Sequence, residues 1–215
     1  MQVDLLTTVD HLIIGSYFIQ DGVDYVYEKL GVLPESGGQH VNMGTHNRLL
    51  KLGESIYLEI IAINPDSPNP DRHRWFSMDK LQPDMKPKLI TWVVRTNNIH
   101  SAVGKAKLKH GRIESMQRGS YNWLITIPDD GEMPLQGVAP TIIQWEGTQH
   151  PTQILSKSDF SLIRIEGFHP HANEINDSLA NIGFNGAFKA KSINESVNPF
   201  LAAFIKSPKG IVKLE

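Results

Sequence analysis

The chain has 215 residues, of which 40% are hydrophobic and 20% are charged, and its formal net charge is −2. This composition is typical of a globular protein, and the charge gives no electrostatic reason to expect nucleic acid or an anionic membrane as a partner. Because the chain contains no cysteine, disulfides, thiolate nucleophiles and cysteine-bound zinc are excluded.

The first 65 residues (1–65) predict one unit built from strands and a helix. The expected elements are a strand at 7–14, a helix at 20–30, a loop at 34–38 and strands at 47–52 and 56–63. The strands are short and rich in β-branched residues, whereas the helix places Val23, Val26 and Leu30 at helical spacing. Gly31 stands where a helix C-cap belongs, since glycine adopts the left-handed conformation without strain.

The same succession of elements recurs twice after a proline-rich connection at 66–87. In the second unit, 88–150, we expect strands at 89–96, 121–127 and 141–145 and a helix at 99–109. In the third unit, 151–215, we expect strands at 160–165, 188–191, 200–206 and 210–214 and a helix at 172–181. Repeated units of this kind bury their faces against one another. The predicted class is α+β, with repeated βαβββ units whose paired mixed sheets form a cup.

Three of the predicted strands each carry one side chain that can bind a divalent metal: His11, His46 and Glu59. Alternate side chains of a strand face alternate sides, so each of the three can point inward. An ionised glutamate in an apolar strand is costly unless it is paired, metal-bound or exposed. Two histidines and one carboxylate are a ligand set that suits zinc, iron, manganese or nickel.

The same residues also allow structural roles. A histidine in a strand is often a hydrogen-bonded structural residue, and Glu59 has Arg48 across the predicted hairpin as an ion-pair partner. Trp92, Trp123 and Trp145 lie in strands of the second unit, either in the core or in a pocket wall. The remaining histidines fall in loops or near helix ends, where we expect them to be exposed: His40, His73, His100, His110, His150, His169 and His171. The connection at 66–87 carries aromatic residues, and we expect it to pack over the cup or over a partner subunit.

Three stretches resemble the glyoxalase-like branch of the vicinal-oxygen-chelate superfamily: Asp10-His11-Leu12-Ile13, Gly44-Thr45-His46-Asn47-Arg48-Leu49-Leu50 and Tyr57-Leu58-Glu59-Ile60. That superfamily includes glyoxalases, extradiol dioxygenases, fosfomycin-resistance enzymes and bleomycin-binding proteins. The resemblance is good over 7–63 and extends as topology to residue 147. It implies paired βαβββ units whose cup holds a divalent metal.

By this resemblance, the first and last strands of each unit supply the metal ligands. In the first unit these ligands are His11 and Glu59. The matching places of the second unit hold Trp92 and either Gln144 or Glu146. Because tryptophan cannot bind a metal, the resemblance implies an incomplete ligand set. Either His46 supplies the missing ligand, or the site binds no metal.

Two functions remain as alternatives. The first is a divalent-metal-dependent lyase, isomerase or dioxygenase acting on a small oxygen-rich substrate, in which Glu59 or Glu146 moves a proton. The second is a non-catalytic protein of the bleomycin-resistance type that sequesters a small molecule. The residues that we expect to contact the ligand are Arg48, Trp92, Trp123 and Gln144.

The expected environment follows from what the sequence lacks. No signal peptide is visible, and no apolar stretch approaches the roughly 20 residues that cross a bilayer, so we expect a cytoplasmic protein. The expected partner is a small molecule, with no nucleic acid and no membrane. Zinc, nickel, manganese and iron are the candidate cofactors, and a homodimer is a candidate assembly.

Overall fold

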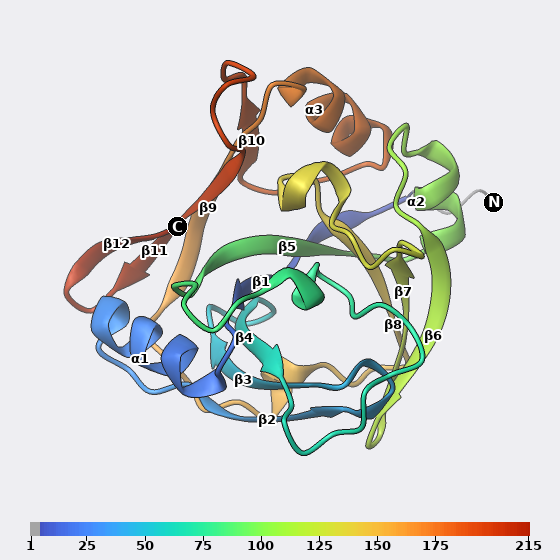
Figure 1. Cartoon of the computed structure of the whole chain (residues 1–215). Coiled ribbons are helices and arrows are strands. Elements are labelled where there is room, and N and C mark those ends of the chain that lie inside the picture. Colours follow the sequence, from blue (N-terminus) through green and yellow to red (C-terminus); the bar gives the residue numbers. More distant parts are fainter. Residues whose placement is uncertain (1–4) are drawn as a thin grey trace.

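The computed structural model describes residues 5–215 as three consecutive groups of strands, each with one α-helix (Figure 1). The first group comprises β1 (Thr7–Gly15), α1 (Ile19–Leu30), β2 (Glu35–His40), β3 (Thr45–Lys51) and β4 (Tyr57–Ile63). The second comprises β5 (Lys88–Thr96), α2 (Ile99–Lys105), β6 (Arg112–Arg118), β7 (Tyr121–Ile127) and β8 (Thr141–Glu146). The third comprises β9 (Ser161–Phe168), α3 (Ala172–Asn181), β10 (Phe188–Lys191), β11 (Phe200–Ser207) and β12 (Gly210–Leu214). Within residues 5–215, the helices are too short or too polar to cross a lipid bilayer.

The first two groups form one continuous eight-stranded sheet with the order β2-β3-β4-β1-β5-β8-β7-β6. In each group the first strand pairs in parallel with the last, and the groups meet where β1 pairs antiparallel with β5. The sheet curls into an open half-barrel (Figure 1). The predicted α+β class, with paired βαβββ units forming a cup, is therefore confirmed.

The two outermost strands of this sheet are absent from the sequence-based prediction. β2 was expected to be a loop, and its sequence Glu-Ser-Gly-Gly-Gln-His lacks the β-branched and aromatic residues that favour strands. β6 is mostly polar. Both become strands because a neighbouring strand offers backbone partners, β3 for β2 and β7 for β6. Gly37 is needed in β2, since a Cβ there would lie 2.0 Å from the Asn47 side-chain oxygen.

The helices end at glycines in two of the three groups. Gly31 caps α1 in the left-handed conformation with φ 73°, as predicted. Gly183 follows the end of α3 with φ 65°. In the second group α2 ends at Lys105, earlier than expected. Gly111 therefore does not cap a helix and instead lies next to the start of β6.

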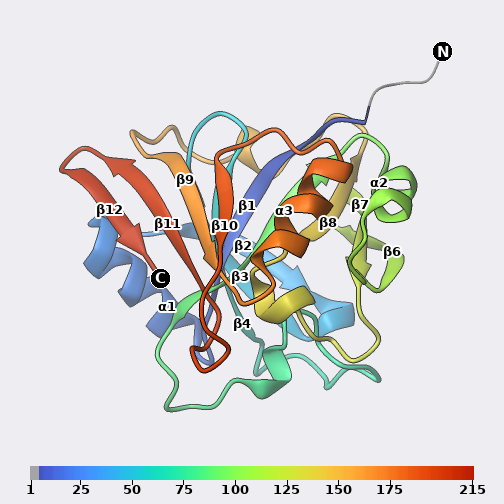
Figure 2. The same cartoon turned by 90° about the horizontal axis from the view of Figure 1, so that it is seen from above.

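The third group forms a separate four-stranded sheet on the outer side of the large sheet (Figure 2). Its order is β10-β9-β11-β12, so its first strand lies beside its second strand and not beside its last. This group repeats the order of elements along the chain but not their pairing. The main core lies between the two sheets, where Trp92 is fully buried and stacks on Phe188 with ring centroids 4.4 Å apart.

The connection at 66–87 crosses the open side of the cup (Figure 1). Trp75, Phe76 and Met78 are buried in a second core formed with the inner face of the large sheet. Two hydrogen bonds join Arg72 to Glu114 of β6 and tie the connection to the second group. Of the two expected positions for this segment, the structure shows the one over the cup.

Candidate functional site

The interior of the cup contains a small cavity that is lined by both polar and apolar side chains. Its volume is about 30 Å³, which is room for roughly two water molecules. The polar residues that line it are His11, His40, Asn47, Tyr57, Glu59 and Arg118. Its walls are aromatic and aliphatic, and they come from β7, β8 and the connection at 66–87.

A β-bulge in β1 brings the side chains of Asp10 and His11 together. Val9 pairs with Val94 of β5 and His11 pairs with Val93, so the register skips Asp10. Adjacent side chains of a regular strand point to opposite faces, whereas a bulge re-aims one of them. Asp10 Oδ1 consequently lies 2.6 Å from His11 Nδ1.

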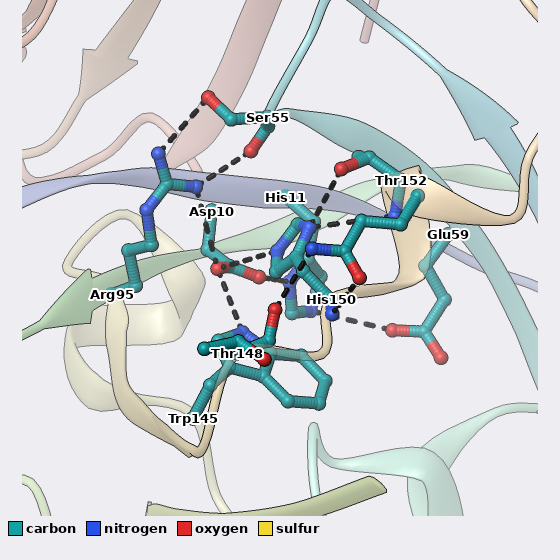
Figure 3. A network of polar contacts seen from close by, with 10 residues as sticks. Asp10, His11, Ser55, Glu59, Arg95, Trp145, Thr148, His150 and Thr152 are labelled. Carbon is teal, nitrogen blue, oxygen red and sulfur yellow. Dashed lines mark hydrogen bonds and ion pairs between the residues drawn. The ribbon is translucent and has the colours of Figure 1, made fainter.

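The other ring nitrogen of His11 faces a second carboxylate. His11 Nε2 lies 3.4 Å from Glu59 Oε2 on β4, and the imidazole stacks on Tyr57 with ring centroids 4.5 Å apart. The remaining carboxylate oxygen of Glu59 accepts a hydrogen bond of 2.5 Å from Asn47 Nδ2. Figure 3 shows the resulting row, in which His11 lies between Asp10 and Glu59.

Asp10 is fully buried and is held by donors from later parts of the chain (Figure 3). Its Oδ2 accepts hydrogen bonds from Trp145 Nε1 at 2.9 Å and from His150 Nε2 at 3.2 Å. Arg95 of β5 lies 3.7 Å from the same oxygen. These contacts offset the cost of burying a carboxylate and fix Asp10 behind His11.

The two carboxylates stabilise a charged His11. Burial disfavours the imidazolium, but the contacts with Asp10 and Glu59 outweigh burial and raise the pKa of His11 to about 9. Burial opposes ionisation of Glu59, yet its hydrogen bond to His11 and the charge of that ring lower its pKa to about 2. Burial is likewise outweighed at Asp10, where His11 and His150 hold the pKa of the carboxyl well below its usual range. At neutral pH the row is an imidazolium between two carboxylates.

His40 and Arg118 form a second pair of polar side chains in the lining of the cavity. His40 ends β2 and Arg118 ends β6, so the pair bridges the two edge strands of the curled sheet. Arg118 Nη1 lies 3.1 Å from His40 Nε2, and His40 Nδ1 lies 3.2 Å from the Thr45 hydroxyl. Because a guanidinium only donates, Nε2 accepts and Nδ1 carries the proton. Burial and the charge of Arg118, opposed by Glu59, lower the pKa of His40 to about 4, so the ring is neutral.

The structure does not bring His46 to His11 and Glu59, which corrects the predicted three-residue metal site. Asn47 faces the cavity, so its neighbours on β3, His46 and Arg48, lie on the other face of the sheet. His46 lines a separate surface depression beside the start of α1. Arg48 does not line the cavity. It also forms no ion pair with Glu59, which contacts His11 instead.

The two tryptophans predicted to contact the ligand lie on opposite faces of the sheet. Trp123 lines the cavity. Trp92 faces the main core and donates a hydrogen bond of 3.0 Å from Nε1 to the Val138 carbonyl. At that level of β5 the residue opposite His11 is Val93. The expected position is thus wrong by one residue, and a shift of one residue in a strand exchanges the two faces.

The faces of β8 are also the reverse of those expected. Ile143 and Trp145 line the cavity, so Gln144 and Glu146 point outward. Gln144 Oε1 accepts a hydrogen bond of 2.7 Å from the backbone N–H of Ile99 at the start of α2. Glu146 is exposed to solvent. The predictions of Gln144 as a ligand contact and Glu146 as a proton carrier are therefore corrected.

Several residues of the site carry weak signals in the sequence. Asp10 precedes His11, but regular alternation assigns it to the opposite face, and only the bulge overturns that assignment. Asn47 lies next to His46, whose imidazole is the stronger metal ligand and therefore the more prominent signal in the sequence. Arg118 ends a strand that the sequence does not predict. Three histidines expected at the surface are buried: His40, His110 and His169.

The donor set of the cavity does not fit a catalytic divalent metal. His11 Nε2 and Glu59 Oε2 are two donors aimed at one point, and Asp10 stands behind His11 as the partner of a metal-bound histidine commonly does. Catalytic zinc takes three protein ligands. The second group offers apolar walls and the permanent charge of Arg118, which opposes a cation. Within residues 5–215, histidines, aspartates and glutamates form no group of three that could hold a metal.

Comparison with known families matches residues 9–183 to the glyoxalase-like domain. The match spans most of the chain and all strands that build the cavity. The chain belongs to the glyoxalase-like domain family. This membership confirms the vicinal-oxygen-chelate superfamily, which the stretches around His11 and Glu59 indicate. A search of curated proteins gave no match to this glyoxalase-like chain.

Several solved structures resemble this glyoxalase-like protein at low sequence identity. A hypothetical protein from Staphylococcus aureus is 14% identical and has a TM-score of 0.61, with 87% of each chain covered. Methylmalonyl-CoA epimerase from Mycobacterium tuberculosis is 14% identical, with a TM-score of 0.43 and 66% of this chain and 88% of that chain covered. A methylmalonyl-CoA epimerase in complex with methylmalonyl-CoA and NH4+ is 16% identical, with a TM-score of 0.45 and 68% and 99% covered. At 14% identity, the likeness to the Staphylococcus aureus protein supports the fold alone.

Proposed function

We propose that this glyoxalase-like protein is an acid–base enzyme that moves a proton at a carbon atom next to a carbonyl group of a small oxygen-rich substrate. The observation that carries the proposal is the buried row of Asp10, His11 and Glu59, in which an acid and a base meet 3.4 Å apart at one cavity. Strongly perturbed titratable groups gathered in a cavity are typical of catalytic sites. The reaction class is that of isomerases and lyases that pass through an enolate.

Glu59 is the base of the proposed reaction. Asn47 holds one carboxylate oxygen, so the other oxygen is directed at the cavity. In the resting site the low pKa of Glu59 reflects the neighbouring charge of His11. When His11 donates a hydrogen bond to a substrate oxygen, its interaction with Glu59 weakens. The pKa of Glu59 then rises, because a nearby cation that is paired with another group lowers a carboxyl pKa less.

His11 is the electrophile that stabilises the enolate oxygen. Because the pKa of His11 is about 9, its Nε2 carries a proton at neutral pH and can donate it to the substrate carbonyl. A donor fixed in advance stabilises the charge that develops in the transition state. Asp10 is a positioning residue, since its contact with Nδ1 fixes the ring and favours its charged form.

Three tryptophans give the site its walls. Trp75, Trp123 and Trp145 line the cavity, and the rings of Trp123 and Trp145 lie 5.4 Å apart. Their apolar surfaces exclude water, which strengthens the electrostatic contacts between the row and a substrate. The walls therefore support both binding and proton transfer in the same cavity.

Members of the superfamily often use divalent metals, which polarise a carbonyl oxygen as Lewis acids. In the proposed reaction that electrophilic role belongs to His11. Titration of chelator-stripped protein with zinc, nickel and manganese tests this assignment, with wild type beside His11→Ala. We expect equal and weak binding by both proteins. Tight metal binding by the wild type that is lost in His11→Ala would show that a metal bound by His11, and not the imidazolium, has the electrophilic role.

A binding protein without chemistry is the second candidate function, favoured by the three tryptophan walls. Such a protein would hold its ligand with the same aromatic surfaces but would not exchange a substrate proton with water. The two functions therefore differ in one measurable property.

Deuterium exchange separates the two functions. The protein is incubated in D₂O with pyruvate, 2-oxobutyrate and levulinate and with their methyl esters, and the protons next to the carbonyl are followed by NMR. We expect exchange above the uncatalysed rate for at least one compound, and a rate lower by roughly 100-fold or more in Glu59→Gln. Glu146→Gln is the matched control, since Glu146 is exposed on the outer face, and it should exchange at the wild-type rate. Saturable binding without exchange by the wild type would favour the binding function.

A further inference from the structure

We infer that the substrate of this site is a small carboxylic acid, and that Arg118 binds its carboxylate while the carbonyl end reaches His11 and Glu59. The inference rests on the proposed function and deepens it. It names the class of substrate and the residue that selects for it.

A surface groove lies directly outside the catalytic cavity. Its volume is about 370 Å³, more than ten times the 30 Å³ of the inner space. His40, Arg118 and Trp123 line both spaces. Because the inner cavity holds only a few atoms, the rest of a ligand must lie in the groove. The path between the two spaces passes the pair of His40 and Arg118.

Arg118 differs from most other arginines in having a neutral partner. Carboxylates lie within ion-pair distance of Arg72, Arg74, Arg95, Arg112 and Arg164. Among residues 5–215, Arg118 forms no such pair, and its hydrogen bond goes to the neutral ring of His40. Its guanidinium also lies 5.9 Å from the ring centroid of Tyr121. A positive charge that faces both spaces is therefore available to an anion.

A carboxylate is a stronger partner for Arg118 than His40 is. Bonds between arginine and a carboxylate are charge-assisted, are often bidentate and are about twice as strong as bonds between neutral groups. His40 keeps its hydrogen bond to the Thr45 hydroxyl when Arg118 turns to a ligand. The exchange thus leaves a neutral imidazole and no buried charge.

The charges of the cavity orient such a ligand. At neutral pH Asp10, His11 and Glu59 together carry one negative charge, and Arg118 carries a positive charge where the cavity adjoins the groove. A ligand carboxylate is repelled by Glu59 and attracted by Arg118. The carboxylate therefore stays at the mouth of the cavity, and the uncharged carbonyl group enters.

Gly38 of β2 leaves room for the side chain of Arg118. A Cβ at Gly38 would lie 2.8 Å from Arg118 Cδ, so Gly38→Ala displaces the arginine without removing its charge. Gly38 does not have a positive φ, and alanine is tolerated by the backbone. This variant tests the position of Arg118 separately from its charge.

Quenching of tryptophan fluorescence measures the binding, because three of the four tryptophans line the cavity. The probes are pyruvate, 2-oxobutyrate and levulinate, each beside its uncharged methyl ester, and inorganic phosphate. We expect at least one acid to bind roughly 10- to 100-fold more tightly than its ester, the range for a hydrogen bond to a charged group. Arg118→Gln should reduce the affinity for the acid to that for the ester, and Arg118→Lys should lose less.

The matched control is Arg112→Gln at the other end of β6. Arg112 is exposed and pairs with Asp129 at 2.6 Å, so the affinity for the acid should not change. If Arg118→Gln proves unstable in a thermal melt, Gly38→Ala takes its place. This variant should lower the affinity for the acid and leave the affinity for the ester unchanged. Equal affinity for acid and ester, no saturable quench by any acid, or tighter binding of phosphate would overturn the inference.

The outcomes distinguish this inference from the proposed function. If wild type exchanges substrate protons through Glu59 but binds acid and ester equally, the acid–base function stands and the role of Arg118 is wrong. If an acid binds through Arg118 and no proton exchanges, the site recognises carboxylates without catalysis.

Discussion

The two halves of the cup share a topology but divide the chemistry between them. The first group contributes the polar side chains of His11, Asn47 and Glu59 to the cavity. The second group sets Val93 opposite His11 in the ladder between β1 and β5, and lines the cavity with Trp123 and other apolar residues. One half of a paired fold therefore contains the whole row of Asp10, His11 and Glu59. The other half supplies the walls and one cation.

The second half also acts on the row from behind. Trp145 of β8 and Arg95 of β5 contact Asp10, which in turn holds His11. These contacts depend on the bulge that re-aims Asp10 in β1. The halves thus differ in role, since the first presents polar groups to the cavity and the second holds Asp10 in place behind His11. Substitutions in the two halves should therefore differ in the size and in the pH dependence of their effects.

The largest loss of stability should follow from His11→Ala in the first half. The change leaves Asp10 and Glu59 buried without the cation between them, and breaking a buried ion pair costs about 3–5 kcal/mol. Urea unfolding at pH 7 measures the free energy of unfolding of the wild type and of the variant. Val93→Ala, at the paired position of the second half, removes two methyl groups and should cost about 2 kcal/mol. Equal losses would show that the row contributes nothing beyond packing.

The pH dependence of stability should carry the signature of the first half. The pKa of His11 is raised from 6.5 to about 9, so its contribution is complete below pH 6.5 and is lost as the pH rises through 9. The pKa of Glu59 is lowered from 4.5 to about 2, so its contribution is complete above pH 4.5 and is lost as the pH falls through 2. Urea midpoints of the wild type should therefore decline above pH 6.5. In His11→Gln this alkaline decline should become flatter, and an unchanged decline would assign it to another group.

A smaller loss should follow from Trp145→Phe, which acts from the second half. The change removes a hydrogen bond of 2.9 Å to the charged Asp10 and should cost about 2 kcal/mol. Trp123→Phe is the matched control, because Trp123 lines the same cavity and does not contact Asp10. If both changes cost the same free energy, the support of Asp10 by the second half would be refuted.

The sequence predicts the parts of this fold that depend on local periodicity. The helix of the first group ends at Gly31, which adopts the left-handed conformation without strain. The strands β1, β4 and β5 are recognisable in the sequence because they are continuous apolar runs. The edge strands β2 and β6 have weak signals, since their partners in the sheet determine their conformation. The cup was therefore predictable, but the strand that ends at Arg118 was not.

The site is harder to predict, because it depends on which face each side chain occupies. His11 and Glu59 follow from the resemblance and from the cost of a buried glutamate. His46, Trp92 and Gln144 each lie next to a residue on the inner face of the large sheet. These inner residues are Asn47 beside His46, Val93 beside Trp92, and Ile143 and Trp145 on either side of Gln144. A bulge or an unknown register exchanges the two faces, and neither is visible in a single sequence.

The smallest effect should come from Gln144→Ala, which tests the reversed face of β8. Gln144 Oε1 accepts from the backbone N–H of Ile99, while the Asn98 side chain accepts from Ser101 in the same first turn of α2. Losing one acceptor at a helix N-terminus costs about 1 kcal/mol, and Asn98→Ala should cost a similar amount. Because Gln144 points away from the cavity, neither change should alter the affinity for an acid in the fluorescence titration. A loss of affinity in Gln144→Ala but not in Asn98→Ala would indicate that Gln144 faces the cavity, and the faces assigned to β8 would be wrong.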